Sequence, residues 1–191
     1  EFIPHDEGHM GELAHKSGVS LEKIRVRVEA LKEQNPMLGH RGCRLGVTYP
    51  EITKMQVRAI LEAAVTVKKK GKSVYPEIMI PLVGHIKELR NQKELIEATA
   101  QLVMRESNTR VDYLIGTMIE VPRAAIVADE IAQEAKFFSF GTNDLTQMAM
   151  GFSRDDADKF LRDYLRLGFY ERNPFQSIDQ EGVGALVKMA I

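Results

Sequence analysis

The sequence predicts an α/β fold in which parallel strands alternate with helices, and it favours part of a (β/α)8 TIM barrel. Two apolar runs that each end in an acid support this prediction: 111–120, which ends at Glu120, and 137–144, which ends at Asp144. Between them, 122–135 is rich in alanine, begins with a proline and spaces its apolar residues as one helix face. A helix that connects neighbouring strands makes them run parallel.

The first 45 residues predict two helices and a short strand. The first helix spans 10–15 and is closed by Gly18, a residue type favoured beyond helix C-termini. The second is capped by Ser20, shows one apolar face and ends at Asn35-Pro36. The segment 37–45 is then expected to be a short strand that runs into a tight loop.

The next segment predicts a helix, a strand and another helix. A capping box formed by Thr48 and Glu51 begins a helix that ends at the lysines of 68–70. The run 76–83 is continuously apolar between prolines, which is typical of a buried strand. Good helix-forming residues then fill 86–106.

The final residues predict three more helices, over 145–150, 153–167 and 178–191. The chain would then hold four βα units, about half of the eight in a barrel. Doubly wound sheets show the same alternation, so that alternative stays open. A barrel needs about 250 residues, so we expect these 191 residues to be a partial barrel, truncated at both ends. Open sheet edges should make half a barrel unstable or prone to aggregation alone.

Composition excludes several classes of protein. The formal net charge is −1, so no bulk basic field marks the chain as a nucleic-acid binder. Apolar runs are too short to span a membrane, and the N-terminus shows no signal-peptide pattern. The single cysteine, Cys43, excludes an internal disulfide framework and fits a reducing compartment. We therefore expect a cytoplasmic location and neither nucleic acid nor membrane as a partner.

The two acids that follow the apolar runs predict a metal site. The carboxyl ends of parallel strands form the ligand-binding face of such a sheet, so Glu120 and Asp144 should point into one crevice. Two carboxylates there can hold Mg²⁺, which completes its shell with substrate oxygens and water. The alternative is that each acid only sits at a helix N-terminus, where the helix dipole favours it.

Three further residues are candidates for chemistry. Arg41 lies in a glycine-bearing loop with a second arginine, which suits phosphate or carboxylate recognition, although both could be surface residues. Arg154 follows the second acidic strand end and could reach the same crevice. Cys43 could be a nucleophile, but a single cysteine is more often a small buried apolar residue.

Three long motifs resemble those of the phosphoenolpyruvate-utilising enzymes. Residues 35–45 resemble their arginine motif, and 116–125 and 138–147 resemble their two metal motifs, in the same order. The flanking residues 48–52, 152–156 and 179–184 are most similar to the members of this family that use ATP and phosphate. The resemblance covers essentially the whole chain.

The resemblance implies specific roles for these residues. Residues 1–191 would be part of a C-terminal (β/α)8 barrel domain that binds pyruvate or phosphoenolpyruvate together with Mg²⁺. Glu120 and Asp144 would ligate the metal, and Arg41 would bind the phosphoryl group. Substrate contacts alongside Asp144 would come from Gly141, Thr142 and Asn143. Arg154 matches an arginine of the enzyme I pattern and is included among the substrate-binding residues on that basis.

The resemblance also implies a reaction. The parent protein would be a phosphotransferase that interconverts pyruvate and phosphoenolpyruvate through a phosphohistidine, with ATP and phosphate as co-substrates. Mg²⁺ would stabilise the pyruvate enolate as a Lewis acid. The phosphohistidine would lie on a separate domain of the same parent, which we expect to be a homodimer, in the plastid if it comes from a plant.

No catalytic residue is expected within these 191 residues. The family's catalytic cysteine and histidine would lie outside the chain, and Cys43 does not match that cysteine motif. We therefore expect the isolated chain to be inactive. The alternatives left open are a phosphoenolpyruvate synthase, an enzyme I-type phosphotransferase, and a non-catalytic binding fragment.

Overall fold

The computed structural model describes residues 3–4, 6–33 and 38–191, and the chain divides into two compact units, Glu1–His40 and Arg41–Ile191. The first unit holds two helices packed against each other, α1 (Glu7–Ser17) and α2 (Leu21–Leu31). Both helices were predicted, and so were the C-cap of α1 and the N-cap of α2. Gly18 adopts the left-handed conformation after α1, and the Ser20 side chain accepts a hydrogen bond from Lys23 N–H. The helix end expected at Asn35-Pro36 lies outside the described residues, and α2 ends before it, at Leu31, with Lys32 as its C-cap.

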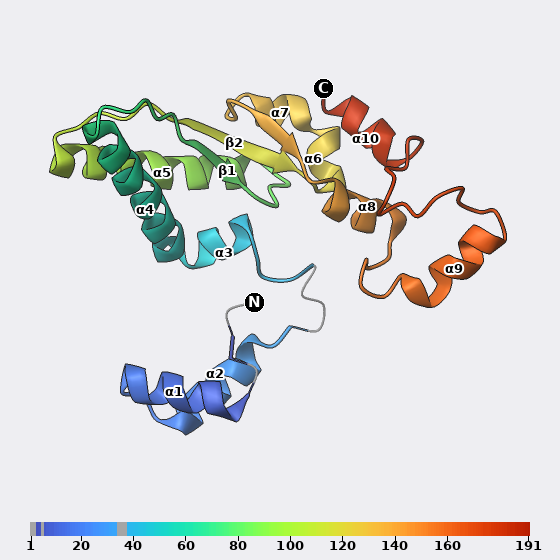
Figure 1. The fold of residues 1–191 in the computed structure, drawn as a ribbon, viewed down its shortest axis with the longest axis horizontal. Coiled ribbons are helices and arrows are strands. Elements are labelled where there is room, and N and C mark those ends of the chain that lie inside the picture. Colours follow the sequence, from blue (N-terminus) through green and yellow to red (C-terminus); the bar gives the residue numbers. More distant parts are fainter. Residues whose placement is uncertain (1–2, 5, 34–37) are drawn as a thin grey trace. The chain divides into compact units, whose positions relative to one another are not determined.

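The second unit contains a three-stranded parallel sheet in the order β1-β2-β3 (Figure 1). Its strands are β1 (Glu77–Ile80), β2 (Leu114–Ile119) and β3 (Phe138–Phe140). In the register, Ile80 lies opposite Thr117, which lies opposite Phe138. The predicted parallel α/β arrangement is therefore confirmed for these three strands.

The strand predicted over 37–45 is wrong for the residues that the structure describes. Helix α3 (Cys43–Thr48) begins there instead. Gly42 takes a left-handed φ of 57°, which turns the chain into the helix, and the Cys43 N–H bonds to the Pro81 carbonyl. In place of the predicted strand, the chain therefore forms a turn that packs on the loop after β1.

Two long helices form the largest helix contact of the second unit. α4 (Pro50–Lys69) and α5 (Ile86–Ser107) pack against each other, and α3 contacts both. The predicted capping box before α4 is wrong, because Tyr49 is the N-cap and makes no side-chain cap hydrogen bond. The Thr48 hydroxyl donates back to carbonyls of α3. α5 carries a capping box of its own, formed by His85 and Glu88.

The helix predicted over 122–135 is two short helices. α6 (Pro122–Ile126) and α7 (Ala128–Ala132) are separated by Val127, whose φ of −112° and ψ of 31° break the helix. By contrast, α8 (Thr142–Met150) starts three residues before its predicted beginning. Asp144 consequently lies in the first turn of a helix and not in a loop.

The last two helices are shorter than predicted. α9 spans Asp158–Arg166, and α10 spans Val183–Met189 and packs against α6 and α8. The Asp179 carboxylate accepts hydrogen bonds from the backbone N–H groups of 181–183. The residues of this turn were predicted to form the start of the last helix, which therefore begins at Val183 and not at 178.

One face of the sheet belongs to the core and the other is partly open. Ile78, Ile80, Ile115 and Ile119 are buried in a single cluster with residues of α4, α5, α6 and α7. On the alternate face, Met79 is 38% exposed, and Leu114 at the start of β2 is 44% exposed. Among the described residues, no helix is long and apolar enough to cross a membrane.

Candidate functional site

Glu120 is a buried carboxylate at the carboxyl end of the central strand. It follows β2 directly and is 4% exposed. Its Oε1 accepts a hydrogen bond from the N–H of Leu82, at 2.7 Å. Leu82 lies in the loop after β1, so the bond joins the ends of two neighbouring strands. This hydrogen bond from the backbone fixes the direction of the Glu120 side chain.

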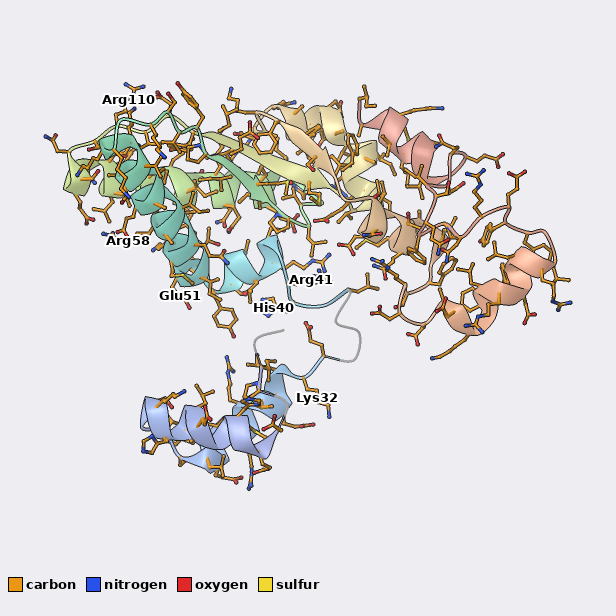
Figure 2. The ribbon with its side chains drawn as sticks, in the orientation of Figure 1. Lys32, His40, Arg41, Glu51, Arg58 and Arg110 are labelled. Atoms are coloured by element: carbon orange, nitrogen blue, oxygen red, sulfur yellow. The ribbon has the colours of Figure 1, made fainter. Side chains whose placement is uncertain are left out.

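The charges of Asp144 and Arg41 both act on Glu120, and the assignment of the three residues to one site stays a prediction. Asp144 lies in the first turn of α8 and is close enough to Glu120 to influence its protonation. Burial raises the pKa of Glu120 above its ordinary value, and Asp144 raises it further; the Leu82 N–H and the Arg41 charge lower it. Arg41 is exposed, immediately before the turn into α3 (Figure 2).

The alternative interpretation, that each acid only lies at a helix N-terminus, applies in part to Asp144. Asp144 does lie in the first turn of a helix, where the dipole favours a carboxylate. It also lies beside Glu120, which a residue serving the dipole alone has no need to do. Glu120 and Asp144 therefore influence each other near the ends of β2 and β3, and the charge of Arg41 also reaches Glu120.

Gly141 packs against the Glu120 side chain. A Cβ at position 141 would lie 2.6 Å from both Cβ and Oε2 of Glu120 and 2.6 Å from Sδ of Met118. No side chain fits this space without displacing the carboxylate. Gly141 is also the N-cap of α8, and its N–H donates to the carbonyl of Ile119. The next two candidates, Thr142 and Asn143, are exposed in the first turn of that helix.

A residue that the sequence analysis missed connects Asp144 to the segment that carries Arg154. Gln147 Nε2 donates to Oδ1 of Asp144 at 3.1 Å, and Gln147 Oε1 accepts from the backbone N–H of Arg154 at 2.8 Å. Asp144 and Gln147 are three residues apart on one helix, a spacing at which Gln and Asp side chains commonly bond, and this spacing could have identified Gln147 from the sequence. The Arg154 side chain is exposed, and its role stays a prediction.

Cys43 is a buried residue, as expected, and not a nucleophile. It is 1% exposed, and burial, together with the nearby Glu88, raises the pKa of its thiol to about 12. A thiol with so high a pKa holds almost no thiolate at neutral pH. Its Sγ instead donates to the carbonyl of Leu82, at 3.3 Å.

The donor set fits Mg²⁺. Hard carboxylate oxygens suit this ion, which ordinarily uses one or two protein carboxylates and takes its other ligands from substrate and water. The part of the chain that the structure describes contains no cluster of three or more His, Cys, Asp or Glu able to hold a metal.

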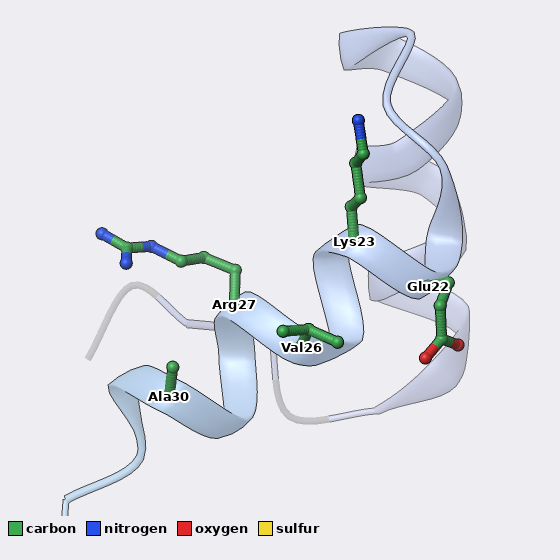
Figure 3. Close-up of a pocket in the computed structure, with 5 residues that line it drawn as sticks. All are labelled: Glu22, Lys23, Val26, Arg27 and Ala30. Carbon is green, nitrogen blue, oxygen red and sulfur yellow. The ribbon is translucent and has the colours of Figure 1, made fainter.

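A separate hollow lies on the first unit and contains none of the predicted site residues. It is confined to α2 (Figure 3), where Val26 and Ala30 provide its apolar wall. Its other lining residues are Glu22, Lys23 and Arg27.

Comparison with known proteins identifies relatives over the full chain. Residues 8–191 match the model of the PEP-utilising enzyme, PEP-binding domain. The chain is 57% identical over its full length to pyruvate, phosphate dikinase from Clostridium symbiosum. It is 55% identical to the chloroplastic pyruvate, phosphate dikinases of Flaveria pringlei and Arabidopsis thaliana. The chain spans 22% of the bacterial relative and 20% of each plant relative. The family resemblance of the three motifs is confirmed.

Proposed function

Because the chain belongs to the PEP-utilising enzymes and matches their PEP-binding domain, we propose that it supplies part of the pyruvate and phosphoenolpyruvate site of a pyruvate, phosphate dikinase. The observation that supports this proposal most strongly is the buried carboxylate of Glu120 directly after β2, which the charges of Asp144 and Arg41 both influence. Charge of both signs at one edge suits an anionic substrate bound together with a metal cation.

Glu120 and Asp144 would hold Mg²⁺ in this proposal. Bound there, Mg²⁺ supplies a Lewis acid for the carboxylate and carbonyl oxygens of pyruvate. The Leu82 N–H donates to Oε1 of Glu120, and Gln147 donates to the carboxylate of Asp144. These two hydrogen bonds would set the ligand directions before the ion binds.

Arg41 would bind the negative charge of the substrate. A guanidinium presents several N–H donors in one plane and suits a phosphoryl or carboxylate group. Its exposure leaves it accessible to an incoming phosphohistidine domain. In the proposed transfer it neutralises charge on the phosphoryl group as that group moves between the histidine and the enolate oxygen. Gly141, Thr142 and Asn143 at the start of α8 would contact the substrate, Thr142 and Asn143 through their backbone amides, because the Gly141 N–H already donates to the Ile119 carbonyl.

The whole reaction needs residues outside this chain. We propose that the parent protein converts ATP, phosphate and pyruvate to AMP, pyrophosphate and phosphoenolpyruvate through a phosphohistidine on another domain. Cys43 takes no part in proton transfer, because its thiol is buried and already bonded to a carbonyl. We expect no turnover from residues 1–191 alone. The dimeric state and the location of the parent stay predictions.

The partly open sheet supports the proposal that the chain is half of a barrel. Parallel sheets are ordinarily covered on both faces, whereas Met79 and Leu114 are exposed on the face away from the core. In a (β/α)8 barrel that face points inward and packs against side chains of the other strands. The remainder of the parent would supply those strands.

Steady-state kinetics of the full-length parent protein test the proposal. Glu120→Gln should lower kcat/KM for pyruvate by about 100-fold or more, the loss expected when a group that stabilises developing charge is removed. Asp112→Asn, at an exposed acid that pairs with Arg110 away from the site, serves as the control and should retain wild-type kinetics. Full activity of the Glu120 variant would refute the proposal. Turnover without phosphate would favour a phosphoenolpyruvate synthase instead.

A further inference from the structure

A chain of three hydrogen bonds connects the loop that carries Arg41 to Glu120. Cys43 donates twice to the turn after β1: its N–H bonds to the Pro81 carbonyl at 3.0 Å, and its Sγ bonds to the Leu82 carbonyl at 3.3 Å. Leu82 in turn donates its own N–H to Glu120, at 2.7 Å. Arg41 is two residues before Cys43, so the same turn holds both the arginine loop and the carboxylate.

The two loops approach so closely that ordinary residues would not fit between them. A Cβ on Gly42 would lie 2.9 Å from Cβ of Leu82 and 3.0 Å from the Pro81 carbonyl oxygen. Gly42 also has a φ of 57°, which favours glycine. Both the close approach and the turn direction therefore depend on position 42 being glycine.

Leu82 itself is held in an unfavourable conformation. Its φ of 58° is uncommon for a residue with a branched side chain, and it is 3% exposed. Backbone strain of this kind persists only where the surroundings fix the residue, and it gathers at functional sites. In this turn the conformation directs the Leu82 N–H at Glu120 and its carbonyl at the Cys43 thiol.

The other end of the turn is also anchored. The N–H groups of Gly84 and His85 donate to Oε2 of Glu88, at 2.8 and 3.0 Å. The Arg123 side chain, from α6, donates to the Gly84 carbonyl. Hydrogen bonds thus hold the turn to α5 and α6. A residue of this protein that bonds to the turn is therefore held in a fixed position in the fold.

We propose that Cys43 is a positioning residue, which fixes Arg41 relative to Glu120 by holding the arginine loop on the Pro81–Leu82 turn. This inference rests on the proposed function, because it assumes that Arg41 and Glu120 act on one substrate. The thiol stays protonated and serves as a hydrogen-bond donor. A cysteine suits the position because it is small enough for the core and still carries a donor for the Leu82 carbonyl.

The test compares Cys43→Ala with Cys43→Ser in the full-length protein. The probe is oxalate, a planar dianion similar to the pyruvate enolate, titrated by calorimetry at saturating Mg²⁺. Alanine removes the donor and should weaken oxalate binding by about tenfold, the equivalent of one lost buried hydrogen bond. Serine keeps a donor and should restore most of the affinity. In kinetics, the alanine variant should raise KM for pyruvate more than it lowers kcat.

A matched control separates positioning from a general loss of packing. Val65→Ala creates a cavity in α4, in the same core cluster but without a hydrogen bond to the site, and should lower the unfolding temperature without changing oxalate affinity. Gly42→Ala provides a second variant, which keeps the thiol but forces the loops apart and should also weaken binding. If an alanine or serine variant at position 43 fails to fold, the Gly42 variant tests the contact between the two loops that the proposal requires, and wild-type oxalate affinity in that variant would overturn the proposal.

The outcomes distinguish this inference from the proposed function. If Glu120→Gln abolishes Mg²⁺-dependent oxalate binding while Cys43→Ala and Gly42→Ala bind as well as the wild type, the positioning role is wrong and the site assignment survives. Equal weakening by alanine and serine at position 43 also contradicts a role for the donor. If Glu120→Gln binds oxalate normally, the proposed function itself fails.

Discussion

The backbone N–H of Leu82 donates to Oε1 of Glu120 over 2.7 Å, although the two residues are 38 positions apart in the sequence. Leu82 lies in the turn after β1, and Glu120 directly follows β2, so a single bond links the segments after two neighbouring strands. It occupies one carboxylate oxygen with a rigid donor. The other oxygen, Oε2, is the one against which Gly141 packs.

Glu120→Gln should stabilise the metal-free protein at neutral pH while it removes metal-dependent binding. The glutamine carbonyl can still accept from Leu82 N–H, and the variant removes a charge disfavoured by burial and by Asp144. We expect a rise in the unfolding temperature of a few degrees, measured by calorimetry on the full-length protein in EDTA. Glu120→Ala loses the Leu82 bond and should lower it. A lower unfolding temperature for the glutamine variant would show that the charge is not disfavoured.

The same residue predicts a pH dependence of stability. The folded-state pKa of Glu120 lies above its ordinary value of 4.5, so the folded state binds the proton more tightly than the unfolded state. Its contribution to stability therefore decreases as the pH rises from about that value through the folded pKa. Unfolding temperatures measured in EDTA from pH 4.5 upward should converge for wild type and Glu120→Gln at the acidic end. Parallel curves would contradict the prediction.

Cys43 should resist alkylation in the folded protein. With a pKa of about 12, raised by burial and Glu88, its thiolate fraction at pH 8 is about three orders of magnitude below that of a free cysteine. Iodoacetamide labelling of the Cys43 peptide, followed by mass spectrometry, should be slow in native protein and rapid in guanidinium chloride. Equally fast labelling in both conditions would show that the thiol is accessible and ionised.

Gln147→Met should weaken the metal site through Asp144. Methionine has a similar shape but makes neither the bond to Oδ1 of Asp144 nor the bond to the N–H of Arg154. We expect Mg²⁺ affinity, titrated in the presence of oxalate, to fall by about tenfold, as for other groups that orient metal ligands. Gln101→Met, on the exposed surface of α5, is the matched control. Identical Mg²⁺ affinity in the two variants would remove Gln147 from the site.

Gly141→Ala should displace Glu120. The new Cβ would need space 2.6 Å from two atoms of that side chain, which overpacks the site at a cost of about 1–3 kcal/mol. Oxalate affinity at saturating Mg²⁺ should fall by at least about tenfold. An overpacking cost of that size would reduce the free energy of oxalate binding by a similar amount. Gly11→Ala is a suitable control, because a Cβ at that position on α1 meets no atom within 4 Å. Binding unchanged by the Gly141 variant would mean that Glu120 can move freely.

Local patterns in the sequence predicted the features that depend on local structure. The apolar runs before Glu120 and Asp144 predicted two parallel strands, and β2 and β3 are parallel. Glu120 directly follows its strand as predicted, whereas Asp144 lies in the first turn of α8. Gly18 and Ser20 predicted helix ends, because caps depend on near neighbours.

Features that depend on distant contacts could not be predicted in the same way. The residues around Gly42 were expected to be a strand, yet they form a turn because Pro81 and Leu82 receive the bonds of Cys43. The break at Val127 divides a segment whose composition favours a continuous helix. Nothing in a single sequence indicates that Leu82 will donate to Glu120 across 38 positions.

The most direct test of the account is a calorimetric titration of oxalate into the full-length protein, with and without Mg²⁺, for wild type and Glu120→Gln. If Arg41, Glu120 and Asp144 form one metal-dependent substrate site, the wild type binds oxalate only with Mg²⁺, and the variant shows no Mg²⁺-dependent binding. Binding by Glu120→Gln with the wild-type affinity and the same dependence on Mg²⁺ would contradict the account.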